Sequence, residues 1–302
     1  MACKQTMFLR ILLNILLIAL VFLLVTVLEL DLGVRPFKQG FYCNDESLSK
    51  PYRDSTVPTV VVICVGTGLN LVVIAIFERL AAHRERTNLN ETYGYQRGSF
   101  LFTQEMIQFY EVFLVFLFGT AIQQGTTNIT KFMTGRLRPH FLDICRPNYT
   151  AFSCVDERGQ PRYITEDVCT GPYSYKALDM RLSFPSGHAS LATYCMVFLV
   201  MYIQVRMQPR RLHLMKAALQ VAALWLALCT CLSRVSDYKH HWTDVVAGAL
   251  LGGVVAILMV GVHVRNFTNH RRIFPETFGI RTVNIPVCPV EPFSNTYIFT
   301  SK

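Results

Sequence analysis

Three short polar stretches of this chain hold the side chains that could act on an anion. They read KFMTGRLRP at residues 131–139, SFPSGHAS at 183–190 and SRVSDYKHHWTD at 233–244. Together they supply lysine and arginine, glycine and proline turns, histidine and aspartate. Positive groups bind anions, and a histidine can transfer protons or act as a nucleophile. Each stretch fits a site, and each also fits a simpler structural role.

The first stretch offers two cations at a helical spacing. Lys131 and Arg138 are seven residues apart, which is two helical turns, so on a helix they would share one face until Pro139 ends it. Two cations on one stripe suit an anion. The alternative is a basic anchor beside lipid headgroups, which is common at the ends of membrane spans and which the fragment alone favours.

The second stretch resembles the start of a helix. Ser186 can cap the apolar run that follows, and Gly187 lets the backbone come close to a ligand. The free N–H groups and the helix dipole favour an anion there, with His188 at the rim. The alternative is an ordinary cap next to an exposed histidine.

The third stretch pairs a histidine with a carboxylate. His240 and Asp244 are four residues apart at the start of the last apolar run, a spacing that puts two side chains on one helix face. A carboxylate that accepts the ring N–H would fix the tautomer and leave the other nitrogen free as a base or nucleophile. His240, His241 and Asp244 could instead hold zinc. Adjacent histidines point in different directions, however, so no metal is expected.

Taken together, the three stretches predict phosphoryl transfer. Lys131, Arg138 and Arg234 are the cations, and with the backbone N–H groups of a helix start they would stabilise the charge of a transferred phosphoryl group without a metal. One histidine as nucleophile and a second that protonates the leaving oxygen would split hydrolysis into two steps. No cofactor is expected.

Membrane-spanning helices must position these stretches. The chain has 302 residues, of which 52% are hydrophobic and only 16% charged, a composition typical of a membrane protein. We therefore expect an all-α, polytopic protein with six transmembrane helices. The six apolar stretches are Ile11–Leu28, Val57–Phe77, Ile107–Ile122, Ala189–Ile203, Ala217–Leu232 and Val245–Val264.

The two ends of the chain have different expected roles. The first apolar stretch is too long for a signal peptide and ends in LELDLG rather than a small-residue cleavage site, so it is expected to be an anchor. Residues 1–264 are expected to form the six-span bundle. Residues 265–302 are polar and contain several prolines, which indicates a loosely ordered cytoplasmic tail.

The density of basic residues predicts the orientation. An even number of spans puts both termini on one side, and lysine and arginine are almost equally divided between the two sides. The sequence VRMQPRRLHLMK at 205–216 concentrates four basic residues in twelve, which indicates a cytoplasmic loop. Both termini are then cytoplasmic, and all three polar stretches lie on the extracytoplasmic side.

Cysteines and a glycosylation sequon support this orientation. Four cysteines fall in the two large loops assigned to the outside, and two disulfides could form among them in any of three pairings. Free thiols in a cytosolic loop are the alternative. Among the sequons, only Asn148 is well placed as a glycosylation acceptor, because the others lie on the cytoplasmic side or beside a span. The four cysteines are Cys43, Cys145, Cys154 and Cys169.

The three stretches also resemble a known family. The patterns K-x6-R-P at 131–139, P-S-G-H at 185–188 and S-R-x5-H-x3-D at 233–244 are similar, complete and in order, to the three-part signature of the type 2 phosphatidic acid phosphatases, a superfamily that includes vanadium haloperoxidases. GFYCNDES, FLFG, GRLRPHFLDIC and RVSDYKHHW resemble its animal lipid phosphate phosphatase branch, the phospholipid phosphatases, which includes the insect Wunen proteins. The resemblance extends from about residue 36 to 265.

The resemblance implies an activity. It implies a six-span, metal-independent phosphatase that acts at the outer or lumenal face on phosphatidate, lysophosphatidate, sphingosine 1-phosphate and ceramide 1-phosphate. It further implies roles in phospholipid metabolism and lipid signalling, a glycoprotein of the plasma membrane, and no nucleic-acid partner. Which lipid is preferred, and whether the chain forms a homo-oligomer, is left open by the sequence.

The resemblance also implies residue roles. His240 would be the nucleophile, Asp244 would orient it, and His188 would be the general acid and later the base. His241 receives no role. Thr243 departs from the serine of many relatives, at a position between catalytic residues. The phosphate-binding residues would be Lys131, Arg138, Ser186, Gly187 and Arg234.

Two other functions compete with this interpretation. A catalytically inert lipid-binding relative would share the fold, but such proteins lack parts of the signature and here every part is present. A transporter is the second alternative, because Asn70 and Glu111 lie within expected spans. Glu111 is near the cytoplasmic end of its helix, where a carboxylate can reach the interface, so transport is disfavoured.

Overall fold

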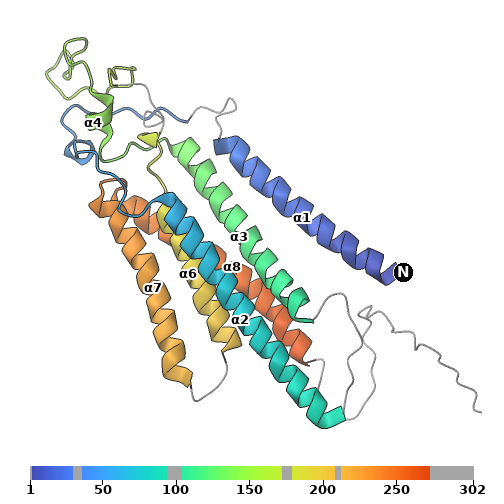
Figure 1. The fold of residues 1–302 in the computed structure, drawn as a ribbon. Helices are drawn as coiled ribbons and strands as arrows, with labels where there is room; N and C mark the ends of the chain where they lie inside the picture. Colours follow the sequence, from blue (N-terminus) through green and yellow to red (C-terminus); the bar gives the residue numbers. More distant parts are fainter. Residues whose placement is uncertain (1, 30–35, 94–103, 172–178, 208–211, 273–302) are drawn as a thin grey trace, which may run out of the picture.

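Helices dominate the part of the chain that the structure describes. The computed structural model describes residues 2–29, 36–93, 104–171, 179–207 and 212–272 (Figure 1). Within these ranges the only extended pairings are isolated bridges, so the expected all-α class is confirmed. The helices are α1 (Ala2–Glu29), the short 3-10 helix η1 (Glu46–Leu48), α2 (Thr59–Tyr93), α3 (Gln104–Thr134), α4 (Phe141–Cys145), α6 (Gly187–Arg206), α7 (His213–Ser236) and α8 (Trp242–Arg272).

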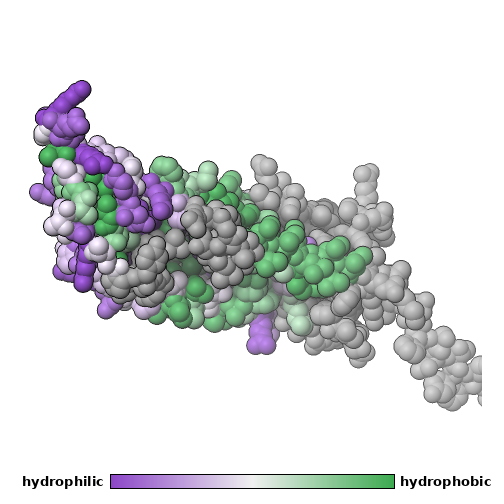
Figure 2. All heavy atoms as spheres, turned by 90° about the horizontal axis from the view of Figure 1, so that it is seen from above, coloured by the Kyte–Doolittle hydropathy of each residue, from purple (hydrophilic) through white to green (hydrophobic). Residues whose placement is uncertain are grey.

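Five of these helices are long and apolar enough to cross a membrane. α1 contains a shorter apolar segment, Ile11–Leu24. Apolar side chains cover the surface of the helices, whereas polar side chains gather at one end of the molecule (Figure 2). The expectation of a multi-pass membrane protein is confirmed. The five spans are Thr59–His83, Gln108–Thr134, Gly187–Arg206, His213–Ser236 and Trp242–Gly261.

Helix α6 lies at the centre of the bundle. Within the most apolar 18-residue stretch of α6, 61% is buried, a larger share than in the other four spans. The helix packs against α2, α3, α7 and α8. Its Tyr194 hydroxyl donates to the Phe116 carbonyl of α3 at 2.7 Å. Helix α1 packs against α3, where the Tyr110 hydroxyl donates to the Ile11 carbonyl at 3.3 Å. These contacts hold α6 and α1 against α3.

Two glycines hold α8 directly against α6. A Cβ on Gly248 would lie 2.4 Å from the Ser186 carbonyl oxygen, and one on Gly252 would lie 2.1 Å from that of Ser190. No side chain fits at either position. Small residues four apart allow helices to approach closely inside a membrane. This contact brings the start of α8 to the start of α6.

The helices alternate in direction, so the three polar stretches meet at one end. Helices α1, α3 and α7 run toward this end, and α2, α6 and α8 run away from it (Figure 1). The start of α1, the end of α6 and the start of α7 lie at the opposite end (Figure 1). Disulfides join Cys43 to Cys154 and Cys145 to Cys169 in the loops around α4, at the same end as the polar stretches.

The last helix is longer than expected. α8 continues to Arg272, so residues 265–272, which we assigned to the tail, are helical. The rest of the tail, residues 273–302, lies outside the described residues.

Candidate active site

The first polar stretch leaves its helix earlier than its spacing suggested. Gly135 has φ +55°, its N–H donates to the Lys131 carbonyl at 3.0 Å, and a Cβ there would lie 1.8 Å from the Phe37 carbonyl oxygen. A glycine in this conformation ends a helix, here at Thr134. The prediction that Lys131 and Arg138 share a helix face is therefore wrong. Arg138 lies beyond the helix, where its N–H donates to the Met180 carbonyl at 2.9 Å.

The second stretch forms the predicted helix cap. Helix α6 begins at Gly187, and the Ser186 hydroxyl accepts from the Ala189 N–H at 3.5 Å. Lys131 Nζ lies 3.3 Å from the place that a Cβ on Gly187 would occupy. A lysine thus stands over the N-terminus of a helix, and both favour an anion.

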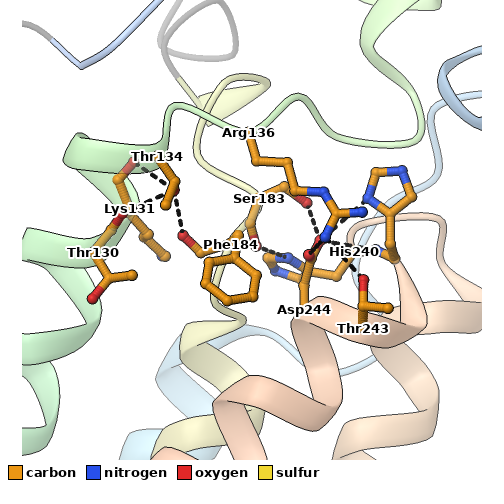
Figure 3. A network of polar contacts seen from close by, with 10 residues as sticks. Thr130, Lys131, Thr134, Arg136, Ser183, Phe184, His240, Thr243 and Asp244 are labelled. Carbon is orange, nitrogen blue, oxygen red and sulfur yellow. Dashed lines mark hydrogen bonds and ion pairs between the residues drawn. The ribbon is translucent and has the colours of Figure 1, made fainter. Parts of the chain in front are cut away.

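The third stretch brings His240 to the second one. Tyr238 has φ +54°, so the chain turns between α7 and α8, and α8 starts only at Trp242. The prediction that His240 and Asp244 share a helix face is wrong, because His240 precedes the helix. The ring Nδ1 of His240 instead donates to the Ser183 carbonyl at 2.7 Å (Figure 3). Since that acceptor requires a proton on Nδ1, Nε2 is left free to attack.

Asp244 reaches His240 through Ser183. Its Oδ2 accepts from the Ser183 hydroxyl at 2.6 Å and from His241 Nδ1 at 3.2 Å. Its Oδ1 accepts from Arg136 Nη1 at 2.5 Å, and the same nitrogen donates to the Thr243 hydroxyl at 2.9 Å (Figure 3). The carboxylate therefore fixes the loop whose carbonyl orients His240. Thr243 keeps the hydroxyl that a serine would offer.

Burial and positive charge keep His240 neutral. The side chain is only 3% exposed, and this burial lowers its pKa well below 6.5. The charges of Arg138 and Lys131 lower the pKa further. The Ser183 carbonyl that holds this ring lies in the same stretch as Gly187, which Lys131 Nζ adjoins. A neutral imidazole among cations is poised as a nucleophile toward an anion.

Both arginines of the site are held by carboxylates. Arg138 Nη2 donates to Asp179 at 2.5 Å, and Arg234 Nη2 donates to Asp237 at 2.5 Å. Arg234 is 1% exposed. The Nε groups of both arginines are buried and have no hydrogen-bond partner in the structure. Anchored guanidinium groups with a donor to spare suit the oxygens of a phosphate.

Two alternatives to this site, a transport pathway through the spans and a metal site, depend on other polar groups. Asn70 is fully buried and donates to the carbonyls of Gly66 and Cys195, so it joins α2 to α6. Glu111 is half-buried on α3. Across the described ranges, no three histidine, cysteine, aspartate or glutamate side chains are grouped as a metal site requires.

Sequence reasoning missed several groups at this site. Arg136, Ser183 and Asp237 had no assigned role, because the sequence does not show which carboxylate faces which cation. The Thr59 hydroxyl is 3.4 Å from His188 Nε2. Nothing in the sequence indicated this contact, because Thr59 is a single polar residue at the start of an apolar run.

Comparison with known proteins identifies the family. The model of the PAP2 superfamily matches residues 112–268, a range that contains all three polar stretches. The chain belongs to the PAP2 superfamily. This PAP2 protein is 38% identical over 232 residues to the rat protein "Phospholipid phosphatase 1", with 77% of each chain covered. It is 37% identical over 226 residues to human "Phospholipid phosphatase 2", which covers 74% of this chain and 73% of that protein.

A fly relative and the solved structures complete the comparison. The Drosophila melanogaster "Putative phosphatidate phosphatase" is 40% identical over 230 residues, which are 74% of this chain and 61% of that protein. No solved structure matches the chain significantly. The predicted membership in the animal branch of the type 2 phosphatidic acid phosphatases is confirmed, and with it the expectation of a phosphatase, a hydrolase of phosphate esters.

Proposed function

We propose that this PAP2 phosphatase removes phosphate from membrane lipid phosphates, without a metal, at the extracytoplasmic face. Phosphatidate, lysophosphatidate, sphingosine 1-phosphate and ceramide 1-phosphate are the proposed substrates. The observation that carries the proposal is that the three polar stretches meet at the polar end of a membrane bundle, where the Ser183 carbonyl holds His240 and Lys131 lies beside the helix start at Gly187.

The first step transfers the phosphoryl group to the protein. His240 Nε2 forms a bond to phosphorus while the bond to the lipid oxygen breaks, and His188 donates a proton to that oxygen, which leaves as an alcohol. The phosphate-binding groups are Lys131, Arg138, Arg234 and the helix start at Ser186 and Gly187. They offset the charge on the phosphoryl oxygens, as a metal does in other enzymes.

The second step releases phosphate. His188, now neutral, takes a proton from a water molecule that attacks phosphorus. The P–N bond to His240 breaks, and inorganic phosphate leaves. Asp244 acts through Ser183 to keep the nucleophile in one orientation and one tautomer.

The proposed topology places this chemistry outside the cytoplasm. Helix α1, the first in the chain, adds a sixth span to the other five. An even number of spans puts both termini on one side, which we assign to the cytoplasm together with the tail. The plasma membrane is the proposed location. Asn148 is exposed at the end of the molecule that carries both disulfides, which supports glycosylation there. Asn128 is 4% exposed, which argues against that sequon as an acceptor.

A lipid substrate suits this arrangement. Its chains stay in the bilayer beside the apolar helices, while its phosphate lies at the membrane face where the polar stretches meet. The site therefore needs no deep aqueous pocket.

The test is phosphate release by purified protein in excess chelator, from a panel of the four lipid phosphates. We expect turnover in chelator, inhibition by vanadate, which mimics the trigonal transition state, and loss of turnover in His240→Ala. Activity that disappears in chelator and returns with magnesium or zinc would indicate a metallophosphatase. An intact protein that binds these lipids without releasing phosphate would be an inert relative.

A further inference from the structure

The segment Ser55–Thr59, which leads into α2, contacts the active site from outside the three polar stretches. It also precedes residues 112–268, to which the family model matches. No role was expected for it from the sequence, in which a membrane span was expected to start at Val57. In the structure it touches groups that serve two different parts of the proposed reaction.

One end of the segment holds the phosphate-binding Arg234. Asp237, which accepts from Arg234 Nη2, also accepts from the Thr56 hydroxyl at 2.6 Å and from the Thr56 N–H at 2.8 Å. The Ser55 hydroxyl accepts from Arg234 Nη1 at 3.3 Å. Burial alone would raise the pKa of Asp237, but the bonds from Thr56 and the charge of Arg234 lower it on balance. The carboxylate is thus a fixed anion that positions Arg234.

The other end of the segment meets the proposed acid. The Thr59 hydroxyl lies 3.4 Å from His188 Nε2. A histidine that first donates and then accepts a proton must keep one orientation through both steps. The contact with Thr59 supports that orientation.

The chain just before the segment is itself anchored. Just before it, the Tyr52 N–H donates to Asp143 of α4 at 2.8 Å, and the Tyr52 ring stands edge-on to His140 at 5.2 Å between centroids. Lys239, the neighbour of His240, places its Nζ 3.7 Å from the centroid of the Tyr52 ring. A segment fixed in this way can transmit a defined geometry to the site.

We infer that Ser55–Thr59 is a fourth part of the active site, in which Thr56 and Asp237 position Arg234 and Thr59 positions His188. The inference rests on the proposed function. Thr56, Asp237 and Thr59 are positioning residues, because they act through Arg234 and His188 and not on the substrate itself.

Thr59 is tested with leaving groups of different basicity. An alkyl phosphate such as lysophosphatidate needs its leaving oxygen protonated, whereas nitrophenyl phosphate releases a stable phenolate and hardly needs the acid. We expect Thr59→Val to lower kcat for the alkyl ester about tenfold and to change kcat for the aryl ester about twofold or less. Thr59→Ser keeps the hydroxyl and should restore the alkyl rate. An equal loss on both esters, or no loss on either, would overturn the role of Thr59.

Thr56 is tested with an anion that occupies the phosphate site. We expect Thr56→Val to raise the inhibition constant of inorganic vanadate about tenfold, because Asp237 loses its hydroxyl donor and holds Arg234 less firmly. Asp237→Asn should raise it further, and Thr56→Ser should restore the original value. Wild-type vanadate affinity in both Thr56→Val and Asp237→Asn would overturn the role of this pair.

A matched control separates these effects from folding. Thr126→Val removes a hydroxyl that donates only within its own helix, to the Ile122 carbonyl at 2.8 Å, and should leave both measurements unchanged. If the wild type releases phosphate from neither ester, the proposed function fails. If the wild type is active and the segment's variants behave like Thr126→Val, only the present inference fails.

Discussion

Ser183 links the nucleophile to its carboxylate at the scale of single residues. Its carbonyl accepts from His240 and its hydroxyl donates to Asp244, so one residue sets the tautomer through its backbone and is held by its side chain. The sequence predicted a direct contact between Asp244 and His240. In the structure Asp244 instead acts on His240 through Ser183. Arg136, which binds the other oxygen of Asp244, completes this support.

Removing the Ser183 hydroxyl should slow the chemical step. We expect Ser183→Ala to lower kcat about tenfold with little change in KM, because the loop that orients His240 loses its contact with Asp244. Steady-state kinetics on lysophosphatidate would measure this. Ser153→Ala, in the loop that follows α4, is the control and should be unaffected. A Ser183→Ala protein with wild-type kcat would show that Asp244 does not act through this residue.

The lowered pKa of His240 should appear in the pH dependence. A histidine whose pKa lies below 6.5 stays neutral, and hence nucleophilic, as the pH falls through 6.5. We expect the acid limb of kcat/KM to lie well below pH 6.5 once the second ionisation of the substrate phosphate has been subtracted. Arg138→Gln removes a charge that lowers this pKa and should move the limb to higher pH. An enzyme limb at or above pH 6.5 in the wild type would contradict the buried, neutral nucleophile.

At the scale of helices, close packing of α8 on α6 aligns the two histidine-bearing stretches. A side chain at Gly252 would push the helices apart and shift His240 relative to His188. We expect Gly252→Ala to cost about 1–3 kcal/mol of stability through overpacking and to lower activity at least about tenfold. Thermal unfolding in detergent and turnover would measure the two effects.

The neighbouring glycine provides a control for this prediction. A Cβ on Gly253 would lie 3.8 Å from Thr193 Cγ2, an ordinary contact, so Gly253→Ala should be tolerated. Equal behaviour of the two alanine variants would show that the close approach of α8 to α6 does not position the site.

The elements also show what the sequence could and could not predict. Runs of about 20 apolar residues identify spans from composition alone, so the five spans were predictable. The ends of the helices were not, because they depend on distant partners. Helix α3 stops where Gly135 meets the Phe37 carbonyl, and α8 starts late because Tyr238 turns the chain. Likewise, Arg136 and Arg138 look alike in the sequence, and only the fold assigns them to Asp244 and Asp179.

The whole molecule has a polar end and an opposite end, and sidedness decides which lipids it can reach. The three polar stretches, both disulfides and Asn148 share one end, whereas the end of α6 and the start of α7 lie at the other. Disulfides form in oxidising compartments, which supports an extracytoplasmic polar end.

This topology predicts the accessibility of both ends in intact cells. A glycosidase should shift the wild type but not Asn148→Gln. An impermeant maleimide should label Glu157→Cys in intact cells and Leu212→Cys only after permeabilisation, because the two positions lie at opposite ends. Intact cells should hydrolyse added lysophosphatidate. Labelling of Leu212→Cys from outside, together with unmodified Asn148, would show that the topology is the reverse of the proposed one.

The covalent phosphate on His240 is the step on which the proposed chemistry depends, and it can be captured directly. In His188→Asn the acid and base is missing, so nitrophenyl phosphate should still phosphorylate the protein while hydrolysis of the intermediate is slow. In excess chelator we predict a burst of about one nitrophenol per protein and a phosphate that is stable to alkali, labile to acid and located on the His240 peptide. Absence of the burst, a phosphate on another residue, or a requirement for added metal would contradict the proposed mechanism.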